Sequence, residues 1–413
     1  MNAHILTIGD ELLIGQVLNT NQAFIAERLN SIGVDVAFMA TVGDRVDAVL
    51  GALRAAWESA AVTVVTGGLG PTHDDITRNA LCTFFCTDLV PNEEVRRHIG
   101  ELMKRRNLPW SAAAEDQSLV PRSAEVVPNP LGTAPGLRFS GDGKTMFVLP
   151  GVPYEMKEMI DGSVIPFLAP LAGEQVIRHR TLLTTGIPES LLAAELGDID
   201  QLLGGASLAF LPSPAGVRLR ITVHGRNPAE ADGTVRDVEG RIRAKVSRYI
   251  YGTDEEDLET VLGRMLAERK LTIAVAESCT GGLIAHRLTN VSGSSAYFER
   301  GVVTYSDASK TELLGVPADT IGACGAVSRE TAESMASGIR SRARTDIGLS
   351  TTGIAGPAGG TPSKPVGTVW IGIADRAGTL ALKFNFGEGR ARIKERASQA
   401  ALELVRRRLM NQE

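Results

Sequence analysis

The sequence has few cysteines, no long apolar run and no excess of basic residues. Its four cysteines, Cys82, Cys86, Cys279 and Cys324, lack the paired spacing of a zinc knuckle, so we interpret Cys82 and Cys86 as core residues. No run of about 18 apolar residues occurs, which excludes a membrane-spanning helix. The formal net charge of −5 argues against direct nucleic-acid binding, because a phosphate-coating surface needs clustered lysine and arginine.

The remaining composition is typical of a soluble globular protein. The chain has 413 residues, of which 43% are hydrophobic and 22% charged. This length predicts about two to four domains. Residues 1–9 contain no basic segment followed by a long apolar one, so we expect a cytoplasmic location, no membrane association and no disulfides.

Residues 1–172 alternate short apolar runs with helical patterns. The apolar runs lie at residues 4–9, 34–43, 61–68 and 145–151, and the helical patterns at 21–31, 46–59, 74–85 and from about Pro153. This order predicts a doubly wound α/β domain with a parallel sheet and right-handed crossovers.

Two further domains are predicted. Residues 173–252 read as β-α-β-β-α-β, which suits a small α+β domain and is compatible with a KH-like fold. No GxxG loop with basic flanks is present, which argues against RNA binding by this domain. The acidic residues 254–259 are expected to cap the next helix. Residues 255–413 again alternate strands and helices, which predicts an α/β domain ending in a helix from about Arg390.

The segment AESCTGGL, residues 276–283, lies between an apolar run and a helical pattern. Ser278 therefore falls on a strand-to-helix turn, where a hydroxyl projects from the carboxyl end of a sheet and the first helical amides face a negative charge. The residue is either a nucleophile or only the N-cap of the helix. Cys279 is a rival nucleophile.

A serine nucleophile needs a base, and the only histidine of this domain, His286, lies two turns into the helix. Lys310 is our candidate, because it follows a strand through a short polar loop where partial burial would lower its pKa. The alternative is a solvated surface lysine. Ser295 is a candidate proton relay between the two, or a turn residue.

Two side chains are candidate substrate contacts. Tyr305 is either a core residue or a ring that stacks on a flat substrate at the end of its strand. Arg392 lies in the first turn of the last helix, where it is suited to bind a phosphate; its alternative is an exposed ion pair with Glu395.

A second candidate site follows the first and third strands of residues 1–172. In GDELLIG (9–15) and TGGLGPTHDDIT (66–77), the glycine amides are suited to cradle a phosphate and the carboxylates to hold a divalent ion. The residues concerned are Gly67, Gly68 and Gly70, with Asp10, Glu11, Asp74 and Asp75. His73 is interpreted as a loop residue that could assist.

These motifs resemble known families. AESCTGGL, the segment 305–310, TTGIAGP (351–357) and GEGRARIKERA (387–397) resemble the nicotinamide mononucleotide deamidases, and the whole chain resembles the CinA family of competence/damage-inducible proteins. The resemblance implies Ser278 as nucleophile and Lys310 as base, supported by Ser295 and Tyr305. It also implies substrate contacts from Thr280, Gly281, Thr352, Gly353 and Arg392.

The N-terminal motifs, with NPLGTAPG (129–136) and LPGVPYEM (149–156), resemble the molybdopterin-binding domain family in its CinA branch. This resemblance implies hydrolysis of ADP-ribose, with Glu155 and Asp74 at the ligand and a divalent metal ion held by Asp10 and Asp75. Binding of a molybdopterin-like ligand is the alternative.

Together, these readings imply a bifunctional enzyme of pyridine nucleotide recycling, and the resemblance implies a homodimer. One activity converts nicotinamide mononucleotide and water to nicotinate mononucleotide and ammonia without a cofactor. The other hydrolyses ADP-ribose with a divalent metal ion. The competing hypothesis is a competence or DNA-damage accessory protein that binds partners.

Overall fold

The apolar runs of residues 1–172 form strands of one sheet. The structure is a computed structural model that describes residues 1–70, 76–173 and 176–411. The strands of this domain are β1 (Asn2–Ile8), β2 (Asp35–Val42), β3 (Val62–Thr66), β4 (Leu89–Pro91), β5 (Leu119–Pro121), β6 (Glu125–Val127), β7 (Gly136–Gly141) and β8 (Lys144–Leu149). Its helices are α1 (Asp10–Leu13), α2 (Thr20–Ser31), α3 (Val46–Ser59), α4 (Thr77–Phe84), α5 (Glu93–Arg105), α6 (Ala112–Gln117), α7 (Pro153–Met159), a π-helix (Ile160–Val164) and α8 (Ile165–Leu168).

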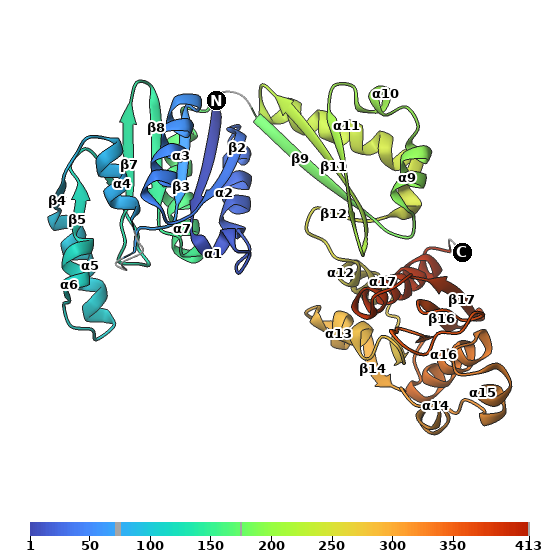
Figure 1. The fold of residues 1–413 in the computed structure, drawn as a ribbon. Coiled ribbons are helices and arrows are strands. Elements are labelled where there is room, and N and C mark those ends of the chain that lie inside the picture. Colours follow the sequence, from blue (N-terminus) through green and yellow to red (C-terminus); the bar gives the residue numbers. More distant parts are fainter. Residues whose placement is uncertain (71–75, 174–175, 412–413) are drawn as a thin grey trace. The chain divides into compact units, whose positions relative to one another are not determined.

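The main sheet of this domain has the strand order β2-β1-β3-β8-β7-β6 (Figure 1). Its first four strands are parallel, and β7 and β6 add an antiparallel edge. Thr7 pairs with Thr66, which in turn pairs with Leu149. Because β1, β3 and β8 end in register, the loops that begin at Gly9 and Gly67 meet at one edge of the sheet.

Helices cover both faces of this sheet. One apolar cluster packs α3, α4 and α5 on one face, and another packs α2 and α7 on the other. All five residues of β3 are buried, as expected for a central parallel strand. The prediction of a doubly wound α/β domain is confirmed.

The middle domain has the predicted β-α-β-β-α-β order. Its strands are β9 (Val176–Thr184), β10 (Ser207–Ser213), β11 (Gly216–Gly225) and β12 (Ile250–Thr253), and its helices are α9 (Glu189–Leu196), α10 (Ile199–Leu203), α11 (Pro228–Val246) and a 3-10 turn (Ser247–Tyr249). The strand order is β10-β11-β9-β12. In β11, buried Leu219 and Ile221 alternate with exposed Arg218 and Arg220, so one face of the sheet is covered.

The third domain contains five strands and six α-helices among the described residues. The strands are β13 (Ile273–Glu277), β14 (Phe298–Val303), β15 (Ile347–Gly353), β16 (Thr368–Asp375) and β17 (Gly378–Asn385). The helices are α12 (Leu258–Glu268), α13 (Leu283–Asn290), α14 (Asp307–Leu314), α15 (Ala318–Cys324), α16 (Arg329–Ala343) and α17 (Arg390–Leu409), with a 3-10 turn (Ser294–Ala296). As expected for the acidic segment, the Asp257 carboxylate accepts the Thr260 N–H and caps α12.

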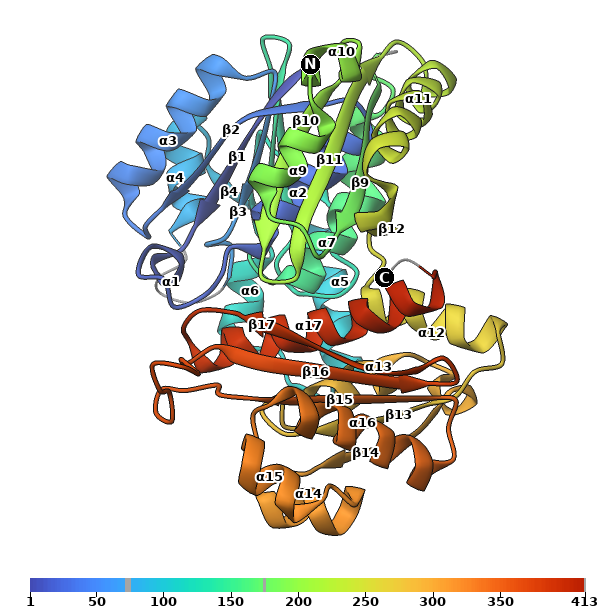
Figure 2. The same cartoon turned by 90° about the vertical axis from the view of Figure 1, so that its right-hand side faces the viewer.

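The third sheet is a layer between two layers of helices (Figure 2). Its order is β14-β13-β15-β16-β17, with β13 parallel to β14 and β15 and the last strands antiparallel. One apolar cluster joins α12, α13 and α17 to one face, and another joins α14 and α16 to the other. Glu277 pairs with both Val303 and Thr351, so Ser278 follows β13 at the edge where β14 and β15 also end.

By internal contacts, the chain divides into two compact units. One consists of Met1–Arg178 with His224–Asp232, and the other of His179–Val223 with Gly233–Glu413. No helix within the described residues combines the length and apolarity needed to cross a membrane.

The expectation that Cys86 is a core residue is wrong. Cys86 is exposed and has a left-handed backbone, with a φ of 51°, because α4 has already ended at Phe84. Cys82 is half-buried, and both are free thiols.

Candidate functional site

Ser278 lies on the turn between β13 and α13. Its N–H donates to the Thr351 carbonyl over 2.9 Å, and its own carbonyl accepts the Gly281 N–H over 3.1 Å. Ser278 is 8% exposed. The turn therefore holds this serine at the carboxyl edge of the sheet, as the sequence predicted.

Glu277, rather than Ser278, caps α13. Its carboxylate accepts the N–H groups of Gly282, Ile284 and Ala285 over 2.9, 3.1 and 2.8 Å. Glu277 is buried, and the N-cap position belongs to Gly282, which offers no side chain. The N-cap interpretation of Ser278 is therefore wrong, and these first-turn amides are taken by an internal carboxylate instead of facing an incoming anion.

The two residues after Ser278 supply backbone donors. The N–H groups of Cys279 and Thr280 donate to no oxygen among the described residues, and the acceptor within their reach is the buried Cys279 sulfur. Burial raises the pKa of the Cys279 thiol to about 12, so this rival nucleophile is protonated at neutral pH. The geometry thus favours Ser278 as nucleophile, with two N–H groups available for an oxyanion.

Thr280 holds the turn through its side chain. Its hydroxyl shares a 2.7 Å hydrogen bond with the Thr351 hydroxyl, and both residues are fully buried. The expected substrate contact of Thr280 is therefore limited to its N–H. Gly281 follows with a φ of 60°, a backbone conformation that favours glycine.

Lys310 is buried at the same edge, so its interpretation as a solvated surface lysine is wrong. It is 1% exposed, and its Nζ donates to the carbonyl of Thr304 over 3.1 Å. The Thr304 N–H donates to the Glu277 carbonyl over 2.8 Å, which ties this loop to the end of β13. No hydrogen bond joins Lys310 Nζ to Ser278 in the described structure.

Two opposing effects act on the ammonium of Lys310. Burial lowers the pKa of Lys310, and the Asp307 carboxylate, 3.8 Å from Nζ, acts in the opposite direction. Beyond Thr304, Nζ makes only long contacts of 3.4 Å to the carbonyls of Tyr305 and Ser306. The net lowering favours the neutral amine that a general base requires.

Tyr305 connects this loop to the start of α17. It is 60% exposed, which contradicts its interpretation as a core residue. Its hydroxyl accepts a 2.8 Å hydrogen bond from Arg390, whose guanidinium also donates to the Gly356 carbonyl over 2.9 Å. Arg390, which sequence reasoning missed, thereby places the first turn of α17 beside the Lys310 loop.

The first turns of α17 gather positive charge without a cap. The helix has no side-chain cap and no acidic residue in its first turn. Arg392 is exposed, and within the described residues it forms no ion pair with Glu395. Lys394 reaches the serine turn, because a Cβ added to Gly281 would lie 3.5 Å from its Nζ. Cations at a helix N-terminus oppose the macrodipole, so this arrangement favours an anionic ligand.

Ser295 lies at the opposite edge of the sheet. It belongs to the 3-10 turn Ser294–Ala296, which precedes β14, whereas Ser278 follows β13. Because the two strands are parallel, the length of a strand, about 16 Å, separates the two serines. The expected proton relay through Ser295 is therefore wrong within one chain.

Thr352 and Gly353 end β15 at the edge that carries Ser278. The Thr352 hydroxyl donates to the Ala326 carbonyl over 2.7 Å and is buried, so it faces away from an incoming substrate. A Cβ on Gly353 would lie 2.7 Å from the Thr368 carbonyl, which explains the glycine by close strand packing. The structure thus brings both residues to the edge without exposing the Thr352 side chain.

The N-terminal motifs line a cavity of about 420 Å³, a size suited to a small ligand. Gly67, Gly68 and Gly70 line it. Gly67 has a φ of 114°, and a Cβ there would lie 2.1 Å from the Ile8 carbonyl. The Gly67 N–H donates to the Leu149 carbonyl and is therefore not available to a phosphate. Of the three glycine amides expected to bind a phosphate, those of Gly68 and Gly70 remain.

The described residues do not assemble the expected metal site. The Asp10 carboxylate accepts the Asp44 N–H over 3.2 Å, and the Asp10 N–H donates to the Asp44 carboxylate over 2.9 Å. Asp10 thus holds the neighbouring loop, and Glu11 is the acidic residue of GDELLIG that lines the cavity. No group of three metal-ligating side chains occurs among the described residues. His73, Asp74 and Asp75 lie outside them.

Glu155 lines the same cavity from the first turn of α7. It is 8% exposed and accepts a 2.7 Å hydrogen bond from Asn129, a residue that sequence reasoning missed. Gln117, also missed, lines the cavity at 4% exposure, and its Nε2 has no hydrogen-bond partner in the described structure. A buried amide without a partner indicates a ligand with an acceptor at this position.

The missed residues had weak sequence signals. Arg390 and Lys394 fall in the quoted GEGRARIKERA segment, where cations without a first-turn acid could have indicated an anion site. Glu277 directly follows a buried run and precedes a helix, which could have indicated a cap. Asn129 begins the quoted NPLGTAPG segment, but only the fold brings its amide to Glu155. Gln117 carries no local pattern, because only the fold brings it to the cavity.

These features define a three-domain α/β protein with a ligand cavity in its first domain and a serine–lysine edge in its third. Three family models match in sequence: the "Probable molybdopterin binding domain" over residues 4–170, the "Damage-inducible protein CinA KH domain" over 179–252 and the "CinA C-terminal domain" over 255–409.

Relatives of similar length match the whole chain. A CinA-like protein of Chloroherpeton thalassium is 45% identical, covering 98% of this chain and 99% of its own. One of Salinibacter ruber is 46% identical, covering 99% and 100%. The crystal structure of the competence/damage inducible protein CihA from Agrobacterium tumefaciens is 41% identical, with a TM-score of 0.35, over 36% of this chain and 94% of that one. The chain belongs to the CinA family.

Proposed function

We propose that the third domain hydrolyses the carboxamide of nicotinamide mononucleotide to nicotinate mononucleotide and ammonia. The observation that supports it is the Ser278 turn, with the N–H groups of Cys279 and Thr280, held at the end of β13 on the sheet edge that also carries the buried Lys310. An amidohydrolase needs these three parts: a nucleophile, a base and an oxyanion site.

In the proposed cycle, neutral Lys310 accepts the proton of the Ser278 hydroxyl as its oxygen attacks the carboxamide carbon. The N–H groups of Cys279 and Thr280 receive the oxyanion. The carbon–nitrogen bond then breaks, and Lys310 returns the proton to the leaving amine, which departs as ammonia. Water attacks the acyl-enzyme and gives a proton to Lys310, the bond between the Ser278 oxygen and the carbonyl carbon breaks, and Lys310 returns the proton to that oxygen. The carboxylic acid product ionises to the carboxylate, and Ser278 and neutral Lys310 are restored.

The proposed substrate contacts lie around this turn. The exposed Tyr305 ring, held by Arg390, offers a face for the nicotinamide ring. Arg392 and Lys394 at the uncapped start of α17 are the proposed phosphate partners, since a guanidinium and helical amides together suit a phosphate.

The test is ammonia release by Ser278→Ala on the intact chain. We expect a loss of about a thousandfold or more in turnover, because the nucleophile is removed. The matched control is Ser295→Ala at the opposite edge, which should keep wild-type turnover. If Ser278→Ala retains more than about a tenth of the activity, the nucleophile is another residue. A wild-type chain that releases no ammonia would support the accessory binding protein instead.

We also propose, as the second activity, hydrolysis of ADP-ribose in the N-terminal cavity. The cavity of about 420 Å³ with the unpartnered Gln117 amide in its wall supports a polar organic ligand there. The divalent ion stays a prediction, because the described residues assemble no ligand cluster for it. Gln117→Leu should weaken ADP-ribose binding about tenfold by calorimetry and spare deamidation. Unchanged binding would remove Gln117 from the site, and ADP-ribose turnover that survives a chelator would refute the metal.

A homodimer is proposed from the family resemblance alone. Sedimentation of the intact chain tests it.

A further inference from the structure

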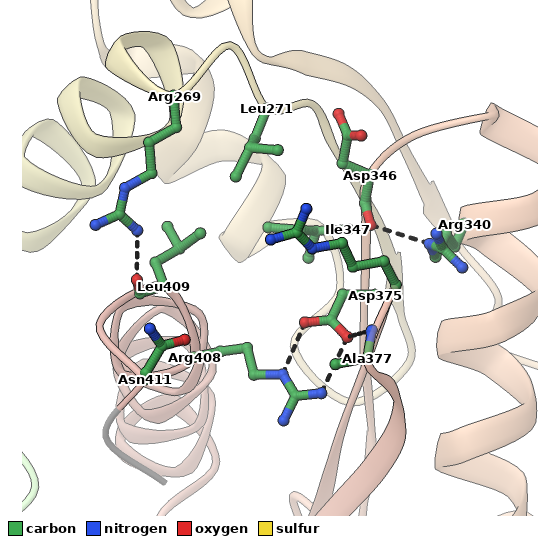
Figure 3. Close-up of a pocket in the computed structure, with 11 residues that line it drawn as sticks. Arg269, Leu271, Arg340, Asp346, Ile347, Asp375, Ala377, Arg408, Leu409 and Asn411 are labelled. Carbon is green, nitrogen blue, oxygen red and sulfur yellow. Dashed lines mark hydrogen bonds and ion pairs between the residues drawn. The ribbon is translucent and has the colours of Figure 1, made fainter.

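The third domain has a hollow of about 910 Å³ whose lining includes no residue of the Ser278 turn. Figure 3 shows the side chains that line it. Its walls come from the end of α12, the last turns of α16, the starts of β13 and β15, the β16–β17 turn and the end of α17. Leu271 and Ile347 lie where the strands begin, whereas Ser278 follows the end of β13. The two places are therefore at opposite edges of the sheet, about 16 Å apart along β13.

Four arginines line this hollow: Arg269, Arg340, Arg376 and Arg408. They come from four separate elements. The hollow also contains two carboxylates, those of Asp346 and Asp375. The lining is thus positive by two charges, although the chain as a whole has a net charge of −5.

Both carboxylates are already engaged. Arg408 binds Asp375 through two hydrogen bonds of 2.7 and 3.0 Å, as Figure 3 shows, and this contact lowers the pKa of the Asp375 carboxyl. The Asp346 carboxylate accepts the N–H and the hydroxyl of Thr272 over 2.8 and 2.9 Å. Asp375 is thus paired with Arg408, whereas Asp346 keeps its charge and forms no ion pair with Arg269, Arg340 or Arg376 among the described residues.

Most guanidinium donors of Arg269, Arg340 and Arg376 have no acceptor among residues 1–70, 76–173 and 176–411. Arg340 uses only its Nε, which donates to the Asp346 carbonyl over 2.9 Å. Arg269 uses one nitrogen, on the Leu409 carbonyl. Arg376, exposed on the β16–β17 turn, has no hydrogen bond or ion pair with the described residues. Forked donors of this kind match the paired oxygens of a phosphate.

We propose that this hollow, termed the arginine pocket, binds a small molecule that carries two or more phosphate charges. Arg340, Arg376 and Arg269 supply the charge-assisted donors, and the Asp375–Arg408 pair forms a fixed floor. The apolar side chains of Leu271, Ile347 and Leu409 offer a surface for a non-charged part of the ligand. Its volume accommodates a ligand of nucleotide size.

The test uses pyrophosphate as the probe on the intact chain, with isoleucine and leucine methyl groups labelled for NMR. We expect the signals of Leu271, Ile347 and Leu409 to shift on titration. Such shifts distinguish binding in this pocket from phosphate binding at the start of α17, near Arg392 and Lys394. Arg376→Gln and Arg340→Gln should each raise the dissociation constant read from these signals about tenfold. Arg376 is exposed on a turn, so its replacement leaves the fold intact.

Arg342→Gln is the matched control, because Arg342 lies on α16 near Arg340, carries the same charge and does not line the pocket. It should leave the dissociation constant within about twofold of the wild type. The proposal is overturned if millimolar pyrophosphate shifts none of the three residues, or if Arg376→Gln and Arg342→Gln weaken the binding equally.

Discussion

Replacing Glu277 tests whether this buried carboxylate holds the catalytic turn. Glu277→Gln keeps the shape of the side chain but leaves it only one acceptor oxygen. In the wild type, the three N–H groups donate to both carboxylate oxygens. At least one buried, charge-assisted hydrogen bond is lost, and such a bond contributes about 1.5–3 kcal/mol. We therefore expect opening of the turn to become easier by about 2 kcal/mol. Glu277→Ala leaves all three donors without a partner and should cost about 3–5 kcal/mol.

Cys279 provides the assay, because its buried thiol, with a pKa of about 12, reacts only when the turn opens. The rate of alkylation at Cys279 is measured by mass spectrometry, with the exposed Cys86 as internal standard. A change of about 2 kcal/mol corresponds to about thirtyfold faster labelling in Glu277→Gln. Deamidation should fall about a hundredfold, since displacement of the nucleophile by about 1 Å has an effect of this size.

Glu299→Gln is the matched control, since Glu299 is exposed on β14 and pairs only with Arg300 among the described residues. It should change stability by less than about 0.5 kcal/mol and leave Cys279 labelling unchanged. Wild-type labelling and turnover in Glu277→Gln would refute the idea that the carboxylate holds this turn.

Three further predictions concern the third domain. Arg392→Ala should weaken kcat/KM for nicotinamide mononucleotide at least about tenfold more than for nicotinamide riboside, because only the nucleotide offers a phosphate; equal losses would exclude a phosphate contact. Because burial lowers the pKa of Lys310 and the neutral amine is the base, kcat/KM should rise with pH through a pKa below the ordinary 10.5; a flat profile in the wild type would exclude Lys310 as the base. The buried Arg406 donates to the Arg248 carbonyl, which a fragment of residues 255–413 lacks and one of 245–413 retains. The free energy of unfolding of the shorter fragment should therefore be lower by about 1–3 kcal/mol; equal urea midpoints would contradict this.

The arrangement of strands and helices could be predicted because periodic runs leave few choices. The helix over residues 46–59 was predicted with its observed bounds, and the last helix with its observed start. Ser278 could also be located, since a turn directly after a buried strand places its first residue at the sheet edge. Lys310 lies at the same edge as predicted, in the first turn of α14 after β14. These predictions depend on local pattern and on parallel strands ending together.

Side-chain direction could not be predicted in the same way. Thr280 and Thr352 are near the site in sequence, but their hydroxyls bond to Thr351 and Ala326 inside the fold. Asp10 follows β1 as expected, yet its carboxylate accepts the Asp44 N–H. Such contacts depend on which loop lies opposite, which the spacing of residues does not specify.

Glu277 shows how one buried charge changes the electrostatics of the site. The sequence predicted an anion site at the first turn of α13, where amides are free in an isolated helix, and a phosphate contact from Arg392. Because the Glu277 carboxylate occupies three of those amides, an incoming anion meets only the N–H groups of Cys279 and Thr280 there. A substrate phosphate then needs a separate cationic partner, and the nearby uncapped start of α17, with Arg392 and Lys394, offers one. The fold thus separates an oxyanion site on the turn from a phosphate site on the last helix.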